Sequence, residues 1–392
     1  MIRIIYISRI NLLSGRTNVY NLAKTCEALN DQKDFKVTLV TTDQSGDLKT
    51  FFKKMGVHRP FDIICLGVTN TASPFSGHGW YEFLMLLLAN LRLSLFLLGR
   101  IRQFEVVYFR DESLFFTAIL ARILLGKGVF FEIHSVLGRP HRQLMNLLAI
   151  RFATGVIAIS SGLKKYYQKI NNNILVSLCS AAEDSWFDYS KDKKVWREEL
   201  NLPKANFLIG YAGVIGANPN NDYYEIDDIV RSLASLPEEI IYVVVGELNS
   251  NGTWLRQIAE ELGVSQRLII VPWQERSEVS RYLLAFDLIL IPKRKKDLVG
   301  DSPAKMFPAL ASRRPIIAGR AECIEEVLTN NQDSLIVETN NPAGWTKAIL
   351  QIYNSQELAE RLARQAEVTK GKYTWEKRGL NIAEFIKKQF NF

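Results

Sequence analysis

The residues between 288 and 318 (LILIPKRKKDLVGDSPAKMFPALASRRPIIA) contain the clearest pattern for binding an anion. A strand that ends at Pro292 is followed by a polar loop and then by the start of a helix. Asp301 or Ser302 is expected to cap this helix, with Pro303 in its first turn and Lys305 one turn in. Free N–H groups at a helix start attract phosphate, so the pattern predicts a phosphate site; an ordinary capped helix is the alternative interpretation.

A histidine follows another strand, in the first half of the chain. Glu132-Ile133-His134 closes an apolar run, which would bring His134 to the carboxyl edge of a sheet. There the imidazole could hydrogen-bond a substrate, although a lone histidine is also common as a satisfied structural residue. Arg139, followed by His141 and Arg142, would meet an anionic acceptor or water. Arg110 also ends a strand, but its neighbours Asp111 and Glu112 could pair with it instead.

These residues require a scaffold of parallel strands, because only parallel strands bring their carboxyl ends to one edge. Short β-branched runs alternate with helical stretches along the whole chain, as in stacked βαβ units. The first series of expected strands is 2–8, 36–42, 61–66, 105–109, 128–133 and 155–159. The second series is 207–211, 240–245, 267–271, 288–291, 315–318 and 334–337. The pattern predicts two doubly wound α/β domains with ligands at the carboxyl ends of the strands, in a cleft between the domains.

The alternation of strands and helices breaks between residues 179 and 206, where the charged segment YSKDKKVWR precedes a proline. We therefore expect one domain at residues 1–185 and a second at residues 186–372. Residues 373–392 are expected to form a closing helix that crosses back to the first domain.

The composition excludes several protein classes. The chain has 392 residues, 47% of them hydrophobic and 23% charged, which is the composition of a globular protein with sizeable cores. Its four cysteines lie far apart without CxxC spacing and are expected to be buried thiols in a reducing compartment. The net charge of +8 favours anionic partners. No helix-turn-helix, zinc finger or aromatic-basic RNA platform is present in the sequence, so we expect no nucleic-acid binding.

The 288–318 stretch resembles the donor-site signature of the retaining GT-B glycosyltransferases of family four. The matching residues are Ser302, Pro303, Lys305, Phe307, Ala311, Pro315 and the Ile316–Ala318 run. The resemblance extends through the second half: Gly210–Gly213 is similar to the first strand and glycine turn of the donor domain, and Val243–Gly246 to its second strand. Ile270–Trp273 is similar to the stretch before the donor loop.

The first half resembles the same family. Tyr108-Phe109-Arg110 followed by an apolar helix, Glu132-Ile133-His134, and the SGRTN segment at residues 14–18 occur in the family's order. The final YTWEKR segment at residues 373–378 is similar to the start of the family's last helix.

Three donor contacts of the family are missing. The turn after the first donor-domain strand reads Gly213-Val214-Ile215-Gly216, where the family usually carries an arginine, and residues 217–222 supply no lysine. Pro308 replaces the usual glutamate, and a proline there removes an N–H and kinks a helix. Lys305 and the KRKK run at residues 293–296 could restore the positive charge; a solvated loop is the alternative interpretation of that run.

Residues 83–98 form the longest apolar stretch, but Asn90, Arg92 and Ser94 interrupt it. It is shorter than a membrane span requires, so we expect no transmembrane helix, and the N-terminus does not look like a signal peptide. With its leucines and terminal arginines, the segment 83–102 could lie on an anionic membrane; a buried helix or hairpin is the alternative.

The resemblance implies a cytoplasmic glycosyltransferase, peripheral on the inner membrane face in one interpretation, that acts with retention on a carbohydrate or lipid-linked acceptor in envelope or exopolysaccharide assembly. The donor would be a UDP-, GDP- or ADP-sugar; no metal or other cofactor is implied. A catalytically inactive or regulatory GT-B protein is the alternative function. His134 is the candidate catalytic residue. The candidate donor-site residues are Gly213, Val214, Gly246, Glu247, Val271, Trp273, Asp301, Ser302 and Lys305. The candidate acceptor-side residues are Ser14, Gly15, Arg16, Arg110, Glu132 and Arg139.

Overall fold

The computed structural model describes residues 1–12, 14, 17–43, 46–67, 79–216, 224–293, 302 and 304–390. The described residues divide into two units. The first unit contains residues 1–179, Ser302 and residues 375–390, and the second contains residues 180–293 and 304–374. The sequence pattern placed the corresponding boundaries at residues 185 and 372.

The first unit is built on seven parallel strands. They are β1 (Ile2–Ser8), β2 (Phe35–Thr41), β3 (Asp62–Cys65), β4 (Val106–Phe109), β5 (Gly128–Ile133), β6 (Gly155–Ala158) and β7 (Ile174–Val176). Its helices include α1 (Thr17–Asn30), α2 (Leu48–Lys54), α3 (Gly79–Gly99), α4 (Phe115–Ile119) with the π-helical turn η3 (Leu120–Leu124), α5 (Pro140–Phe152), α6 (Ser161–Tyr167) and α15 (Trp375–Gln389). The strands are almost continuously apolar, as expected for a parallel sheet covered on both faces.

The order of the first sheet is β3-β2-β1-β4-β5-β6-β7, so the chain reverses direction across the sheet between β1 and β4. Ligands of open α/β sheets bind outside the carboxyl ends of the strands at such a point. Arg110 directly follows β4 and His134 directly follows β5, the next strand in the sheet. The sheet therefore brings both residues to the edge where a ligand is expected.

The second unit repeats this plan with six parallel strands. They are β8 (Phe207–Ala212), β9 (Ile240–Glu247), β10 (Leu268–Pro272), β11 (Leu288–Ile291), β12 (Ile316–Gly319) and β13 (Leu335–Val337). Its helices include α7 (Lys193–Glu199), α8 (Ile226–Leu233), α9 (Thr253–Glu261), α10 (Arg276–Ala285), α11 (Met306–Ala311), α12 (Glu322–Glu325), α13 (Pro342–Tyr353) and α14 (Gln356–Lys370). The order β10-β9-β8-β11-β12-β13 puts its reversal point between β8 and β11.

The predicted strands all occur, three of them with the predicted ends and the others with ends shifted by one or two residues; strand β7 was not predicted. The prediction for the start of α11 is wrong, because Ser302 does not cap it: Lys305 is the capping residue and supplies no side-chain hydrogen bond. Within the described residues, no helix combines the length and apolarity needed to cross a membrane.

Candidate functional site

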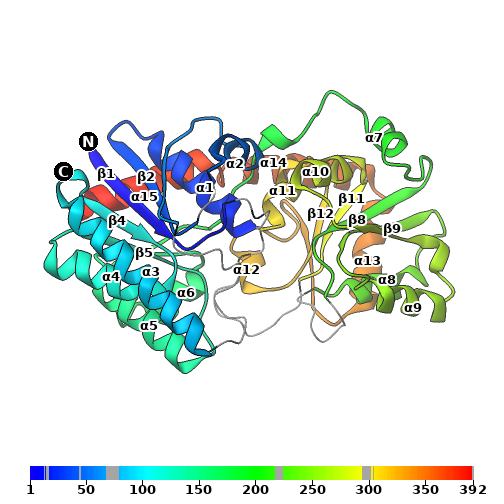
Figure 1. Cartoon of the computed structure of the whole chain (residues 1–392). Helices are drawn as coiled ribbons and strands as arrows, with labels where there is room; N and C mark the ends of the chain where they lie inside the picture. The colour runs from blue at the N-terminus through cyan, green and yellow to red at the C-terminus, as the bar shows by residue number, and fades with distance from the viewer. Residues whose placement is uncertain are drawn as a thin grey trace. The chain divides into compact units, whose positions relative to one another are not determined.

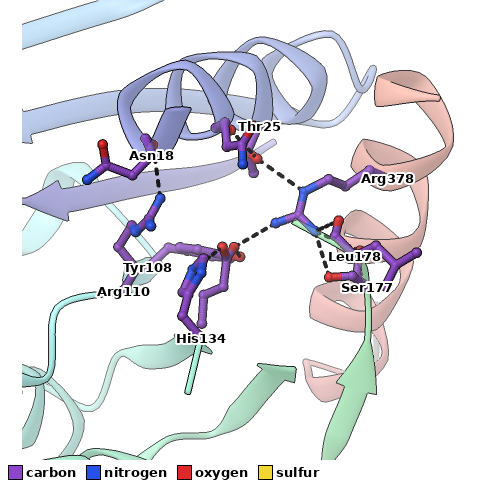
Figure 2. Close-up of polar contacts among 10 residues, drawn as sticks. Asn18, Thr25, Tyr108, Arg110, His134, Ser177, Leu178 and Arg378 are labelled. Carbon is purple, nitrogen blue, oxygen red and sulfur yellow. Dashed lines mark hydrogen bonds and ion pairs between the residues drawn. The ribbon is translucent and has the colours of Figure 1, made fainter. Parts of the chain in front are cut away.

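Glu132 and His134 meet at the carboxyl end of β5. Residues two apart on a strand project from the same face, and the Nε2 atom of His134 lies 2.8 Å from a carboxylate oxygen of Glu132. Figure 2 shows the imidazole beside this carboxylate, with the helices α1 and α15 nearby. The His134 side chain is partly exposed, whereas that of Glu132 is buried. Glu132 therefore positions the imidazole of His134 from the buried side. Because Glu132 is itself buried, the prediction that it contacts the acceptor directly is not supported.

Glu132 is a buried charge with three partners. In addition to its contact with His134, Glu132 accepts a hydrogen bond from the Tyr108 hydroxyl at 2.5 Å and forms an ion pair with Arg378 at 2.7 Å. Glu132 is 2% exposed and Arg378 5% exposed. An isolated carboxylate in such a place would cost many kcal/mol, so the complete set of partners is what allows it to remain ionised.

Arg378, on α15, connects this carboxylate to two other elements (Figure 2). Its guanidinium also donates to the Thr25 hydroxyl on α1 at 3.1 Å and to the backbone oxygens of Ser177 and Leu178, at 2.8 and 2.5 Å. The next residue, Gly379, permits the close approach of the two helices, because a Cβ there would lie 2.4 Å from the backbone oxygen of Ala28. The final helix thus anchors the end of β5.

The protonation states follow from this environment. Burial by itself raises the pKa of Glu132, but the charge of Arg378 and the hydrogen bond with His134 reverse this and hold that pKa well below its usual range. Burial, and then the positive charge of Arg110, lower the pKa of His134. At neutral pH a neutral His134 therefore faces an ionised Glu132. Since the carboxylate can only accept, Nε2 carries the imidazole proton and Nδ1 remains an acceptor.

The other acceptor-side residues lie in varied surroundings. Arg110 is partly buried and donates to the backbone oxygen of Asn18 at the start of α1, at 3.0 Å (Figure 2). Ser14 hydrogen-bonds the backbone oxygen of Asn11 through its own hydroxyl. Arg139 is exposed at the start of α5. Gly15 and Arg16 lie outside the described residues.

In the second unit, two candidate donor-site glycines lie against each other at the ends of β8 and β9. Gly246 has a φ of +129°, which favours glycine strongly, and a Cβ on it would lie 2.3 Å from the backbone oxygen of Gly213. Gly213 donates its N–H to the backbone oxygen of Val245 at 2.8 Å. Val214, next in this turn, is exposed. Only residues without side chains allow the two turns to approach this closely.

Lys305 lies across this glycine turn. A Cβ on Gly213 would lie 1.8 Å from Cε of Lys305, so the lysine side chain occupies the space above the turn. Its ammonium nitrogen lies 3.7 Å from the ring centre of Tyr224 and 5.4 Å from that of Tyr211. The aromatic faces attract the cation and fix its position at the carboxyl end of β8.

Glu247 is held by the protein itself. Its two oxygens accept a bidentate ion pair from Arg256 at 2.7 and 2.8 Å, and one of them also accepts the N–H of Gly252 at 2.9 Å. The Arg256 hydrogen bonds are the largest cause of a lowered pKa for Glu247. These partners secure the start of α9 and compete with the ribose contact that we considered. Val271, on β10, is partly exposed and pairs with Val245. Trp273, directly after β10, is exposed and donates its backbone N–H to the backbone oxygen of Glu247.

The remaining candidate cations and cap residues differ from the sequence interpretation. Asp301 lies outside the described residues, and Ser302 is partly buried and precedes α11 without capping it. Lys293 is 3% exposed, with its ammonium nitrogen 5.3 Å from the ring centre of Tyr224, so a solvated-loop interpretation is wrong for this residue. The rest of the KRKK run lies outside the described residues. Pro308 stands inside α11.

The sequence pattern does not identify the residues that hold His134 and Lys305 in place. Arg378 and Tyr108 stand out in the sequence only as parts of segments that resemble the family, and no pattern marks Tyr211 or Tyr224 as the partner of a cation. A charged residue within the apolar spacing of the last helix was the available signal for Arg378. Nothing local to Tyr224 indicates its contact with Lys305, 81 positions further along the chain.

Comparisons with known proteins find similarity to glycosyltransferases in the second unit. Residues 192–369 match the family model described as glycosyl transferases group 1. A D-inositol 3-phosphate glycosyltransferase from Xylanimonas cellulosilytica is 25% identical over 183 residues, which cover 46% of this chain and 42% of that protein. The chain thus spans less than half the length of the curated relatives that it matches.

Solved structures resemble the chain over nearly its whole length. The structure of HepE from Anabaena in complex with UDP and glucose has a TM-score of 0.73 at 15% identity, covering 99% of this chain and 100% of that one. A glycosyltransferase from Rickettsia africae has a TM-score of 0.76 at 15% identity, covering 99% and 98%. At this identity the likeness concerns the fold, which is GT-B: two Rossmann-like α/β domains with parallel sheets. The chain has this fold, and its residues 192–369 match the model of the glycosyl transferases group 1 family.

Proposed function

We propose that the protein is a glycosyltransferase that moves a sugar from a nucleoside-diphosphate sugar to a hydroxyl acceptor, with retention of anomeric configuration. The observation that carries this proposal is the ammonium of Lys305, held by two tyrosine rings above the Gly213 turn in the part of the chain that matches the family. The solved relative from Anabaena, which binds UDP and glucose, supports a uridine nucleotide as the first donor to try.

The donor half of the reaction requires a place for a departing diphosphate. Negative charge develops on the leaving group, and fixed positive groups stabilise it most when they need no reorganisation. Lys305 meets this condition because aromatic rings constrain its ammonium before any ligand binds. The backbone N–H of Val214, in the turn after β8, supplies a further donor for a phosphate oxygen. Together they replace the arginine and lysine that the family usually carries.

In this proposal His134 hydrogen-bonds the transferring sugar. With Nε2–H directed at Glu132, its Nδ1 atom accepts a hydrogen bond from a hydroxyl of the transferring sugar. A neutral imidazole suits this role better than a cation. Arg378 and Tyr108 act as positioning residues, because they hold Glu132 ionised and in place.

The acceptor in this proposal is a carbohydrate or a lipid-linked glycan of the cell envelope, reached from the cytoplasmic side. The exposed leucines of α3 support a peripheral location at a membrane.

The first test is the thermal stability of the protein with a panel of nucleotides and nucleotide sugars. A ligand that binds only the folded state raises Tm, and we expect one nucleoside diphosphate and its sugar to do so by several degrees. Lys305→Ala should lose this rise, whereas Lys347→Ala, which removes an exposed lysine of α13, should keep it. If none of the nucleotides shifts Tm, the missing family residues are decisive and the chain is a non-catalytic GT-B protein.

A further inference from the structure

Helix α3 exposes a continuous leucine face. Six leucines spaced three or four residues apart are each 44–59% exposed: Leu84, Leu87, Leu88, Leu91, Leu95 and Leu98. The opposite face of the helix is buried: Ala89 is 1% exposed, and Leu93 and Leu97 belong to the apolar core of the first unit. Scattered exposed leucines are ordinary on protein surfaces, but an aligned set on one helix marks an interaction surface.

The apolar surface continues onto the neighbouring helices. Helix α3 lies beside α4, and α4 beside α5, as Figure 1 shows. The segment of α4 and η3 adds Phe116, Ile123 and Leu124, which are 58–71% exposed, and α5 adds Leu144. Ten of the 19 large hydrophobic side chains that the described part of the chain exposes therefore lie between residues 84 and 144.

A basic groove adjoins this surface. It has a volume of about 1180 Å³, and its lining includes Arg122, Arg151 and Lys169 together with Ile123. None of these three cations has an ion-pair partner among the residues that the structure describes. Ile123 belongs both to the groove and to the exposed apolar set, so cations and apolar side chains share one boundary.

The charge of the surrounding sequence is one-sided. Residues 79–182, counted from the start of α3, contain 12 lysines and arginines and 5 acidic residues. Four of the acidic residues are within ion-pair distance of an arginine: Glu105 of Arg3, Asp111 of Arg9, Glu112 of Arg142, and Glu132 of Arg378. The excess of positive charge in this segment therefore favours an anionic partner.

We propose that the α3 leucine face and the Arg122–Arg151–Lys169 groove together dock the protein on an anionic membrane. The leucines would enter the boundary between headgroups and acyl chains, and the groove would receive anionic phosphate headgroups. A second copy of the chain fits less well, because a two-fold contact would bring two basic surfaces together. This inference identifies the residues behind the membrane location proposed above, and no part of it rests on the transfer reaction.

The test is co-sedimentation of the full chain with vesicles of phosphatidylcholine, with and without phosphatidylglycerol, at low and high salt. We expect binding only to the vesicles that contain phosphatidylglycerol, and weaker binding at high salt. Leu91→Ser/Leu95→Ser should reduce binding roughly tenfold or more, because two apolar contacts with the membrane are lost. Arg122→Gln/Arg151→Gln/Lys169→Gln should reduce it on the order of a hundredfold, at about a fivefold loss for each charge.

Matched controls separate these effects from general changes. Leu380→Ser removes an exposed leucine of α15, and Lys53→Gln/Arg231→Gln/Lys347→Gln removes three exposed cations that do not line the groove. Both controls should bind vesicles like the parent protein. A melting curve for each variant shows that it is folded.

Two results would overturn the proposal. The first is equal sedimentation of all variants, or no sedimentation with anionic vesicles. The second is a dimer in solution that Leu91→Ser/Leu95→Ser dissociates, without vesicle binding by the parent protein; the leucine face would then belong to a contact between copies.

Discussion

The two units position their key side chains by different means. In the first unit, His134 stands on a buried carboxylate that Tyr108 and Arg378 satisfy, with partners from α1, β4 and α15. In the second unit, Lys305 lies against two aromatic rings and a glycine turn, next to the six-residue helix α11. We infer that the first arrangement is coupled to folding, whereas the second can be altered with little effect on stability. The predictions below test this contrast.

The largest expected effect is on stability, from Arg378→Met. This change leaves Glu132 buried without its cationic partner, which should lower the free energy of unfolding by about 3–5 kcal/mol. Urea denaturation measures the loss. Lys387→Met, which removes an exposed ion pair of the same helix with Asp34, should lower the stability far less, because solvent screens exposed charges. A similar loss of unfolding free energy in both variants would contradict the importance assigned to the buried network. Adding Glu132→Gln to Arg378→Met should recover part of the stability, because the unpaired buried charge is then removed.

Gly246→Ala should have the next largest effect. Its φ of +129° and its contact with Gly213 leave no room for a Cβ, so we expect a loss of about 2–3 kcal/mol together with loss of nucleotide binding. Gly99→Ala provides the control, since a Cβ there would meet no atom within 4 Å. Unfolding curves and calorimetric titration of both variants make the comparison. Normal stability of Gly246→Ala would show that the two turns can separate.

The pH dependence of stability should carry a smaller contribution from His134. Because its pKa in the folded protein is lowered, the unfolded chain binds a proton first as the pH falls. The stability contributed by the neutral imidazole is therefore complete above pH of about 6.5 and decreases below it. Urea denaturation at pH 7.5 and 5.5 should show a steeper loss for the parent protein than for His134→Gln. Parallel losses would mean that His134 titrates alike in the folded and unfolded states.

Lys305→Met should affect stability least. A cation over an aromatic ring contributes about 0.5–1 kcal/mol, so the unfolding curve should move little. The same variant should lose nucleotide binding measured by calorimetry. If it loses stability like Arg378→Met, the lysine is a structural residue and the proposed contrast between the units fails.

The sequence was sufficient for those features that depend on local pattern. The strand at residues 128–133 and the placement of His134 after it followed from an apolar run and its polar end, and parallel pairing follows from alternating strands and helices. The role of Glu132 was not predictable, because its burial depends on Arg378, 246 positions away. The start of α11 was mispredicted since Ser-Pro is a common cap signal, whereas here the first turn forms after Lys305. The exposure of the α3 leucines was not predictable either, because an apolar run alone does not show which face of the helix packs against the rest of the protein.

The central claim is that donor binding belongs to Lys305 and sugar transfer to His134, and the slow transfer of the sugar to water tests it most directly. With the nucleotide sugar that raises Tm, release of the nucleoside diphosphate should be measured for the parent protein, His134→Ala and Lys305→Ala. The account predicts that His134→Ala binds the nucleoside diphosphate with unchanged affinity and releases product from the donor at least about 100-fold more slowly, whereas Lys305→Ala fails to bind either. Product release by His134→Ala at the parent rate would contradict it.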